Sequence, residues 1–145
     1  MDRELTIGEV YRAQMELRDL ARHPKIVGPT ALSDNCEIFL KPENLQHTGA
    51  FKLRGAAYKI SQLTDEEKKR GVIACSAGNH AQGVALSATR NGIKSLICLP
   101  QGAPISKIEA TKRLGAEVCL VPGVYDDAYA KALELRDKHG YTFVH

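Results

Sequence analysis

The 145-residue sequence contains no tryptophan, and aromatic residues make up only 6% of it. So few rings offer little surface on which nucleic-acid bases could stack, and a net charge of +3 is too small to indicate a nucleic-acid partner. No apolar run approaches the roughly 20 residues of a membrane-spanning helix. The N-terminus, from Met1 to Glu4, is charged and lacks an apolar signal core, which argues against secretion. We therefore expect a cytoplasmic protein that binds neither nucleic acid nor membrane.

Cysteine is also scarce, with residues only at Cys36, Cys75, Cys98 and Cys119. No two of them form the C-x-x-C pair that is typical of zinc sites and thiol oxidoreductases. Each lies in an apolar, strand-like stretch, so we expect buried, reduced thiols in a cytosolic protein. The five histidines show no metal-ligand spacing, and the sequence therefore predicts no metal site.

The second half of the chain has a regular rhythm. Apolar, β-rich runs begin near Val72, Ser95, Glu117 and Tyr141, at intervals of 23, 22 and 24 residues. Glycine is the residue most common at a left-handed helix C-cap, and one stands before or close to each run. These glycines are Gly71, Gly92, Gly115 and Gly140.

Helical patterns fill the intervals between these runs. After Asn79, apolar residues recur at helical spacing, and a similar stripe follows Val124. Pro104 suits the first turn of a third helix. Strands and helices that alternate at this length predict an α/β fold, with an open, mostly parallel sheet covered by helices on both faces.

The first half is less regular. A capping box at Thr6–Glu9 predicts a helix that runs to about Leu20, and a loop containing Pro24, Gly28 and Pro29 follows it. We expect a strand over 37–41 and a helix over 51–63. A second capping box opens a short, solvated helix over 64–70, acidic at its start and basic at its end.

A small-residue segment follows the first of the regular strands. It reads Ser76-Ala77-Gly78-Asn79-His80-Ala81-Gln82-Gly83. Ligands of open α/β sheets bind beyond the carboxyl ends of the strands, and free N–H groups at a helix start attract anions such as carboxylates. The spacing Gly78-x-x-x-x-Gly83 is that of a P-loop, but Lys-Ser/Thr does not follow Gly83, which argues against an NTPase. The G-x-G-x-x-G of a dinucleotide-binding fold is also missing. Taken alone, the segment is also typical of an ordinary strand-to-helix turn.

A second small, polar segment, Thr48-Gly49-Ala50-Phe51-Lys52-Leu53-Arg54-Gly55, places a lysine at the start of a predicted helix. A lysine amine that can lose its proton can form a Schiff base with an aldehyde. An exposed helical lysine without a function would look the same when taken by itself.

Together, the two segments carry a specific likeness. The run from Lys41 to Ala56, KPENLQHTGAFKLRGA, followed about twenty residues later by SAGNHAQG, resembles the threonine dehydratase family. These are pyridoxal-phosphate enzymes of the tryptophan synthase β-type fold, which also include serine racemases and serine dehydratases. The segment from Leu99 to Lys107, LPQGAPISK, is similar to the same family, and the likeness extends from Thr6 to the end of the chain.

The resemblance implies a role for individual residues. Lys52 is expected to hold pyridoxal 5'-phosphate covalently and to take the α-proton of the substrate. Phe51 is expected to lie against the pyridine ring, and Asn79 to donate a hydrogen bond to the 3′ oxygen of the cofactor. Arg54 is expected to brace the lysine loop. The implied substrate-binding residues are Ser76, Ala77, Gly78, Asn79 and His80.

The reaction implied by the family is β-elimination. L-Threonine, and L-serine as a second substrate, would give 2-oxobutyrate or pyruvate together with ammonia. Racemases of the family tend to carry a serine immediately before Gly-Asn-His, and Ala77 in that position favours a dehydratase. A serine racemase-like enzyme stays open as an alternative. Ala50 departs from the serine of many relatives, which bears on the hydrogen bonds of the loop.

Family enzymes are more than twice as long as this chain. Their glycine-rich phosphate loop, and the side chain that faces the pyridine nitrogen, lie downstream of the region that matches His145. We therefore expect an N-terminal part of a longer homo-oligomeric enzyme, a dimer or tetramer, and an inactive chain when it is alone. Residues 1–51 would belong to the incomplete large catalytic domain and residues 52–145 to the small α/β domain. A truncated, non-catalytic family member is the alternative.

Overall fold

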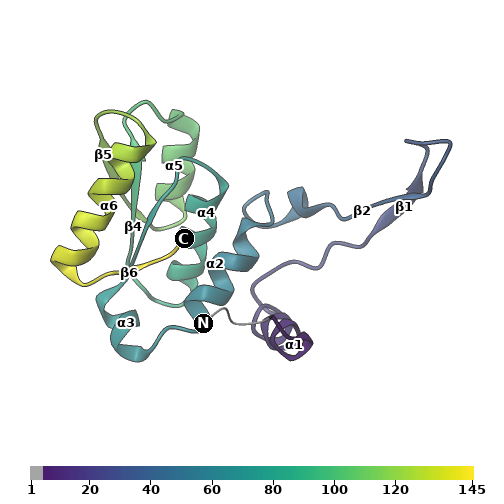
Figure 1. Ribbon diagram of the computed structural model, residues 1–145, viewed down its shortest axis with the longest axis horizontal. Coiled ribbons are helices and arrows are strands. Elements are labelled where there is room, and N and C mark those ends of the chain that lie inside the picture. The colour runs from purple at the N-terminus through teal and green to yellow at the C-terminus, as the bar shows by residue number, and fades with distance from the viewer. Residues whose placement is uncertain (1–4) are drawn as a thin grey trace.

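The computed structural model describes residues 5–145 and shows an α/β body from which a two-stranded arm extends (Figure 1). Residues 1–4, on which the argument against secretion was based, lie outside the described residues. The helices are α1 (Ile7–Glu16), the 3-10 helix η1 (Glu43–Leu45), α2 (Lys52–Ser61), α3 (Asp65–Arg70), α4 (Asn79–Arg90), α5 (Ile105–Arg113) and α6 (Tyr125–His139). The strands are β1 (Val27–Thr30), β2 (Ile38–Leu40), β3 (Val72–Cys75), β4 (Ser95–Pro100), β5 (Glu117–Val121) and β6 (Thr142–Phe143).

The main sheet has four strands in the order β5-β4-β3-β6, and every neighbouring pair is parallel. Val72 of β3 lies opposite Ser95 of β4 on one side and opposite Thr142 of β6 on the other. The predicted strand starts at Val72, Ser95 and Glu117 are confirmed, and the last strand begins one residue later than Tyr141. The predicted α/β class with a parallel sheet is confirmed.

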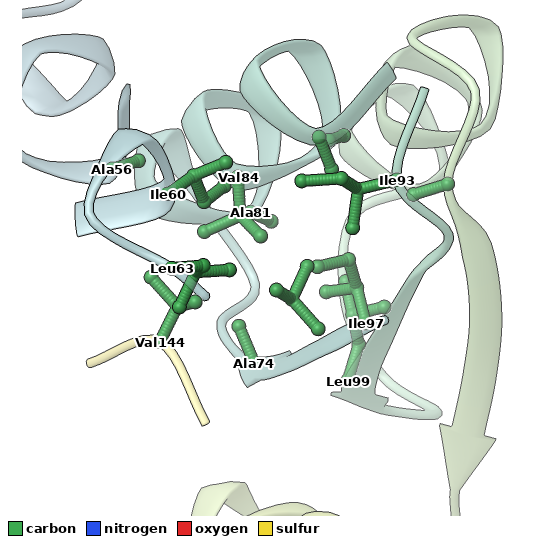
Figure 2. Packing of buried hydrophobic residues seen from close by; sticks show 14 of the residues in the cluster. Ala56, Ile60, Leu63, Ala74, Ala81, Val84, Ile93, Ile97, Leu99 and Val144 are labelled. Atoms are coloured by element: carbon green, nitrogen blue, oxygen red, sulfur yellow. The ribbon is translucent and has the colours of Figure 1, made fainter. Parts of the chain in front are cut away.

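Helices cover both faces of this sheet, because successive side chains of a strand point to opposite sides. Ile73 and Cys75 pack with Ala128 and Ala132 of α6 on one face. On the other face, side chains from β3 and β4 pack against α2, α4 and α5. Figure 2 shows this second cluster, in which Ile60, Ala81 and Val84 lie close to one another and Ile97 lies beside Leu99 on the strand. Burial on both faces explains why β3 is a continuous apolar run.

The helix ends agree closely with the sequence signals. Both predicted capping boxes are present, at Thr6 and at Thr64, and all four predicted C-cap glycines have positive φ. The first helix ends at Glu16 instead of near Leu20, and residues 17–20 form turns. Pro104 occupies the N-cap of α5, one residue before its first turn. Among residues 5–145, no helix combines the length and the apolar character that crossing a bilayer requires.

The prediction of a simple loop around Pro24–Pro29 was wrong. Residues Val27–Thr30 form β1, which pairs antiparallel with β2 through Val27↔Leu40 and Thr30↔Ile38. A Cβ at Gly28 would lie 2.7 Å from the Ile38 carbonyl oxygen, so only glycine allows this close approach. Pro29 has no N–H to donate, which an edge strand tolerates. Local sequence could not reveal the pairing because it depends on a partner about ten residues away.

The cysteines divide into two groups, which corrects the expectation that all four are buried. Cys36 is exposed in the loop between β1 and β2, whereas Cys75 and Cys98 are buried and Cys119 is half-buried in the main sheet. Burial is the main cause that raises the pKa of the Cys98 thiol to about 12, and the neighbouring Cys119 adds to it.

The native protein is therefore expected to react with iodoacetamide first at Cys36, with Cys98 modified only after unfolding. A thiol reacts through its thiolate, which burial disfavours at Cys98 while also excluding the reagent. Timed quenching followed by peptide mass spectrometry gives the order of modification. Equal rates at Cys36 and Cys98 without denaturant would contradict the packing of β4 under α6.

Candidate functional site at the start of α2 and α4

Lys52 is the first residue of α2. Phe51 occupies the N-cap position but supplies no side-chain cap, and the residue is 59% exposed. The Lys52 Nζ atom lies 5.2 Å from the centroid of that ring. Within residues 5–145 the Lys52 amine has no hydrogen bond and no ion pair. It is therefore an amine without a carboxylate partner, next to an aromatic face.

An arginine holds the loop that precedes Lys52. Arg54 Nε donates to Oε2 of Glu43 at 3.0 Å, and Arg54 Nη2 donates to Oε1 at 2.8 Å. The hydrogen bonds from Arg54 hold the pKa of Glu43 below its ordinary value of 4.5, against the opposing effect of partial burial. The expectation that Arg54 braces the lysine loop agrees with this bidentate contact.

Replacing Glu43 with glutamine is expected to destabilise the protein by about 1 kcal/mol at neutral pH, since the pair is partly exposed. Because the pKa of folded Glu43 is lowered, its stabilising effect is present above pH 4.5 and is lost as pH falls through the lowered value. Urea unfolding of both proteins between pH 7 and pH 3 measures the difference. Glu109→Gln, at an exposed ion pair with Lys112, is the matched control. A difference for Glu43→Gln that stays constant throughout this range would contradict the assignment.

The small-residue segment over 76–83 contains the turn from β3 into α4. The Gly78 N–H donates to Ser76 Oγ at 3.2 Å, and the Ser76 N–H donates to the Cys98 carbonyl oxygen at 3.2 Å. Gly78 is the N-cap of α4 and supplies no side-chain cap. Asn79 is exposed, and its amide has no hydrogen-bond partner among residues 5–145. The helix therefore begins with N–H groups that are available to an anion.

One cavity brings the two segments together. It measures about 250 Å³ and is lined by Phe51, Lys52, Arg54, Gly55, Ala56, His80 and His145. His80 Nε2 lies 3.1 Å from the Val144 carbonyl oxygen, which ties α4 to the end of β6. Of the predicted site residues, Phe51, Lys52 and His80 line the cavity. Ser76, Ala77, Gly78 and Asn79 belong to the adjacent turn and do not line it.

Sequence reasoning missed His145 as a cavity residue. A signal was present, because His145 follows the last regular strand, and the carboxyl ends of parallel strands lie at one edge of a sheet. The ring of His145 lies 4.7 Å from the ring of Phe143, centroid to centroid. His145 therefore adds an imidazole to the lining that also includes Lys52.

The close approach of α2 to α4 sets the spacing between the two segments. A Cβ atom at Gly83 would lie 3.1 Å from the Lys52 carbonyl oxygen and 3.2 Å from the Leu53 nitrogen. The start of α2 therefore rests directly on the second turn of α4, and a side chain at Gly83 would require the two backbones to shift apart. Leu53, Ile60 and Val84 complete this contact and are fully buried.

Comparison with known proteins identifies the class. The family model described as "Pyridoxal-phosphate dependent enzyme" matches residues 24–145. The chain belongs to this family of pyridoxal-phosphate-dependent enzymes.

Individual relatives agree with that membership. The chain is 48% identical over 143 residues to the L-threonine ammonia-lyase of Thermotoga maritima, covering 97% of this chain and 36% of that protein. It is similar in structure to the processed form of threonine deaminase isoform 2 from Solanum lycopersicum, with a TM-score of 0.86, 35% identity and coverage of 97% and 41%. Maize serine racemase gives a TM-score of 0.90 at 30% identity, with coverage of 96% and 43%. The chain thus spans less than half the length of these relatives.

The residues at the cavity fit the cofactor that the family name specifies. Pyridoxal phosphate is an aldehyde, and the Lys52 amine beside the cavity has no competing partner within the described part of the chain. The Phe51 ring offers an aromatic face, and His80 and His145 place imidazole rings at the lining. Residues 5–145 contain no group of three or more His, Cys, Asp or Glu side chains that could hold a metal ion.

Proposed function

We propose that this chain acts in a pyridoxal-phosphate-dependent lyase that converts L-threonine to 2-oxobutyrate and ammonia. The observation that carries the proposal is the shared cavity, because Lys52 and His80 come from separate segments and yet line the same space. The relatives named as threonine ammonia-lyase and threonine deaminase support the choice of reaction. L-Serine, which would give pyruvate, is the proposed second substrate.

Lys52 is the proposed catalytic residue. Its amine would hold the cofactor covalently, and once released it would take the proton from the α-carbon of the substrate. The chemistry that bound pyridoxal phosphate supplies is delocalisation of the negative charge left at that carbon. The Phe51 ring would pack against the cofactor, and the Asn79 amide would hydrogen-bond to it. The β-hydroxyl would then leave as water, and hydrolysis of the released enamine would give the oxo acid and ammonia.

The turn into α4 is the proposed carboxylate site. The uncapped N–H groups at the start of the helix carry partial positive charge, which favours a carboxylate. The residues assigned to it are Ser76, Ala77, Gly78, Asn79 and His80. Ala77 has a methyl group where family racemases tend to have a hydroxyl, so no proton can be donated from that position. This supports elimination over racemisation.

The size of the cavity bears on where the rest of the site lies. At about 250 Å³ it is smaller than the roughly 300–1,000 Å³ of typical ligand pockets. We place the remaining contacts, including those to the cofactor phosphate, in the portion of the relatives that this chain does not match. In the same frame, residues 1–51 are assigned to a large domain and residues 52–145 to a small one. A non-catalytic family member is the second candidate, and the small cavity favours it.

The test is covalent trapping on the 145-residue chain. The protein is incubated with pyridoxal phosphate, reduced with borohydride and mapped by peptide mass spectrometry. Because the contacts to the cofactor phosphate are placed outside this chain, the proposal expects an adduct that forms at Lys52 in preference to the other lysines. Lys59 is exposed on the same helix and is the matched control, so Lys59→Ala should leave the adduct in place while Lys52→Ala removes it.

The outcomes separate the two candidates. Selective labelling of Lys52 supports the lyase, and release of 2-oxobutyrate from L-threonine is then measured on the same protein. Label scattered over Lys59 and other exposed lysines would contradict cofactor binding by this chain and would favour the non-catalytic member. Sequencing of the reading frame beyond codon 145 identifies the remaining contacts, if they are encoded there.

We also propose a cellular location and an oligomeric state for the enzyme. We assign it to the cytoplasm, where thiols such as those of Cys75 and Cys98 stay reduced. A homo-oligomer, a dimer or tetramer, is supported by the apolar side chains exposed on α1 and on the arm of β1 and β2. Light scattering measures the mass, and a monomer at micromolar concentration would contradict the oligomer.

A further inference from the structure

A connected set of hydrogen bonds ties two segments, one at Arg22 and one over residues 43–46, to the first turn of α2. Besides its bidentate contact with Glu43, Arg54 Nη2 donates to the Arg22 carbonyl oxygen at 3.0 Å. The Glu43–Arg54 pair is partly shielded, with 19% of the Glu43 side chain and 29% of the Arg54 side chain exposed. Charge-assisted, bidentate contacts of this kind are stronger and more directional than neutral hydrogen bonds.

Gln46 extends this set of hydrogen bonds. It is buried, its Oε1 accepts from the Arg22 backbone N–H at 3.0 Å, and its Nε2 donates to the Arg22 carbonyl oxygen at 2.6 Å. Arg22 Nη1 in turn donates to the Leu45 carbonyl oxygen at 3.1 Å. The segment around Arg22 and the segment 43–46 are therefore fixed to each other and, through Arg54, to α2.

The position of Arg54 relates this set of contacts to the lysine. Arg54 lies two residues after Lys52 and lines the same cavity. Phe51 supplies no cap for the helix that begins at Lys52, so no local side chain fixes the start of α2. The guanidinium of Arg54 is already engaged by a carboxylate and a carbonyl group, which leaves it poorly suited to bind a substrate anion itself.

We propose that the Glu43–Arg54 pair is a positioning element that holds the start of α2 so that the Lys52 amine faces the cavity. This inference rests on the proposed function for the role of Lys52, whereas the fixing of the loop is independent of it. The pair acts through Lys52 and contacts neither substrate nor cofactor. Its loss is expected to change where and how fast the lysine reacts more than it changes the stability of the fold.

Two variants test the pair by different routes. Arg54→Gln keeps a polar side chain without a new amine but loses the charged planar fork, and Glu43→Gln keeps the shape but loses the negative charge. Glu109→Gln breaks an exposed ion pair on α5 and is the control variant. Each protein is labelled with pyridoxal phosphate and borohydride, and the rates at Lys52 and Lys59 are compared within one sample. Amide hydrogen exchange over residues 43–52 and the thermal midpoint are measured in parallel.

Arg54→Gln and Glu43→Gln are each expected to lower the Lys52-to-Lys59 labelling ratio about tenfold and to speed amide exchange over 43–52 by a similar factor. Glu109→Gln should change neither quantity. Unchanged ratios and exchange rates in both variants would overturn the inference. So would a fall in Lys52 labelling that is matched by equal losses at Lys59 and in helical signal, because that pattern means general unfolding.

Failure of the proposed function gives a different pattern. If the unsubstituted chain shows no preference for Lys52, cofactor binding is contradicted and the labelling ratio no longer applies. Amide exchange then decides the inference by itself. Faster exchange confined to 43–52 in Arg54→Gln supports a positioning element, and unchanged exchange rejects it.

Discussion

Replacing Gly83 with valine is expected to destabilise the protein by about 1–3 kcal/mol and to reduce trapping of the cofactor at Lys52. A Cβ atom at this position would approach the Lys52 carbonyl oxygen to 3.1 Å and the Leu53 nitrogen to 3.2 Å, and valine adds two further methyl groups. The atoms in the way are backbone, so they cannot rotate aside. The helices α2 and α4 must then separate, which moves Lys52 away from His80. Urea unfolding and adduct mapping measure the two effects.

Gly55 provides the matched control for this substitution. It lies in the interior of α2, and nothing lies within 4 Å of the position that its Cβ would take. Gly55→Ala is therefore expected to stabilise the protein by about 0.5–1 kcal/mol, since alanine is the better helix former. Equal effects of Gly83→Val and Gly55→Ala would mean that α2 and α4 are not in close contact.

Truncating Ile97 to alanine is expected to cost about 2–5 kcal/mol. Ile97 lies in the central strand β4, is fully buried, and packs in the cluster shared by α2 and α4 (Figure 2). The neighbouring secondary structure limits how far the cavity can collapse. Leu120→Ala on β5 removes the same kind of side chain at 45% exposure and should change stability by about 0.5 kcal/mol or less.

The order of these two stabilities is the decisive result. Urea unfolding monitored by circular dichroism gives the free energy of unfolding for each variant. A loss of stability for Leu120→Ala as large as that for Ile97→Ala would contradict the placement of the core between β4 and the helices α2, α4 and α5. It would indicate instead that the outer strand β5 is covered.

Much of the sheet could be predicted from the sequence because its signals are local. Apolar runs, glycine caps and helical stripes recur at nearly equal intervals, and the strands starting at Val72 and Ser95 follow from them. The Lys52 and Ser76–Gly83 segments were found from small residues next to helix starts. Those features depend only on neighbours in the chain.

Most of the misses share a different cause. The pairing of β1 with β2 and the exposure of Cys36 depend on contacts between distant parts of the chain. The Glu43–Arg54 contact joins residues eleven positions apart across a loop. Periodicity and composition carry no information on contacts between residues this far apart, so the geometry of the Glu43–Arg54 pair could come only from the structure.

The position of β6 has a consequence for the order in which the molecule is assembled. Strand β3 cannot acquire its second neighbour until residues 142–144 have been synthesised, because Thr142 N–H donates to the Gly71 carbonyl oxygen and Val144 N–H to that of Ile73. Arg70 reaches across 70 residues to the Gly140 carbonyl oxygen at the same junction. Pairings this far apart in sequence form late, because the chain must lose the entropy of closing a long loop before the stabilising contacts can form. During translation, a nascent chain would therefore carry Lys52 long before the His80–Val144 contact could form.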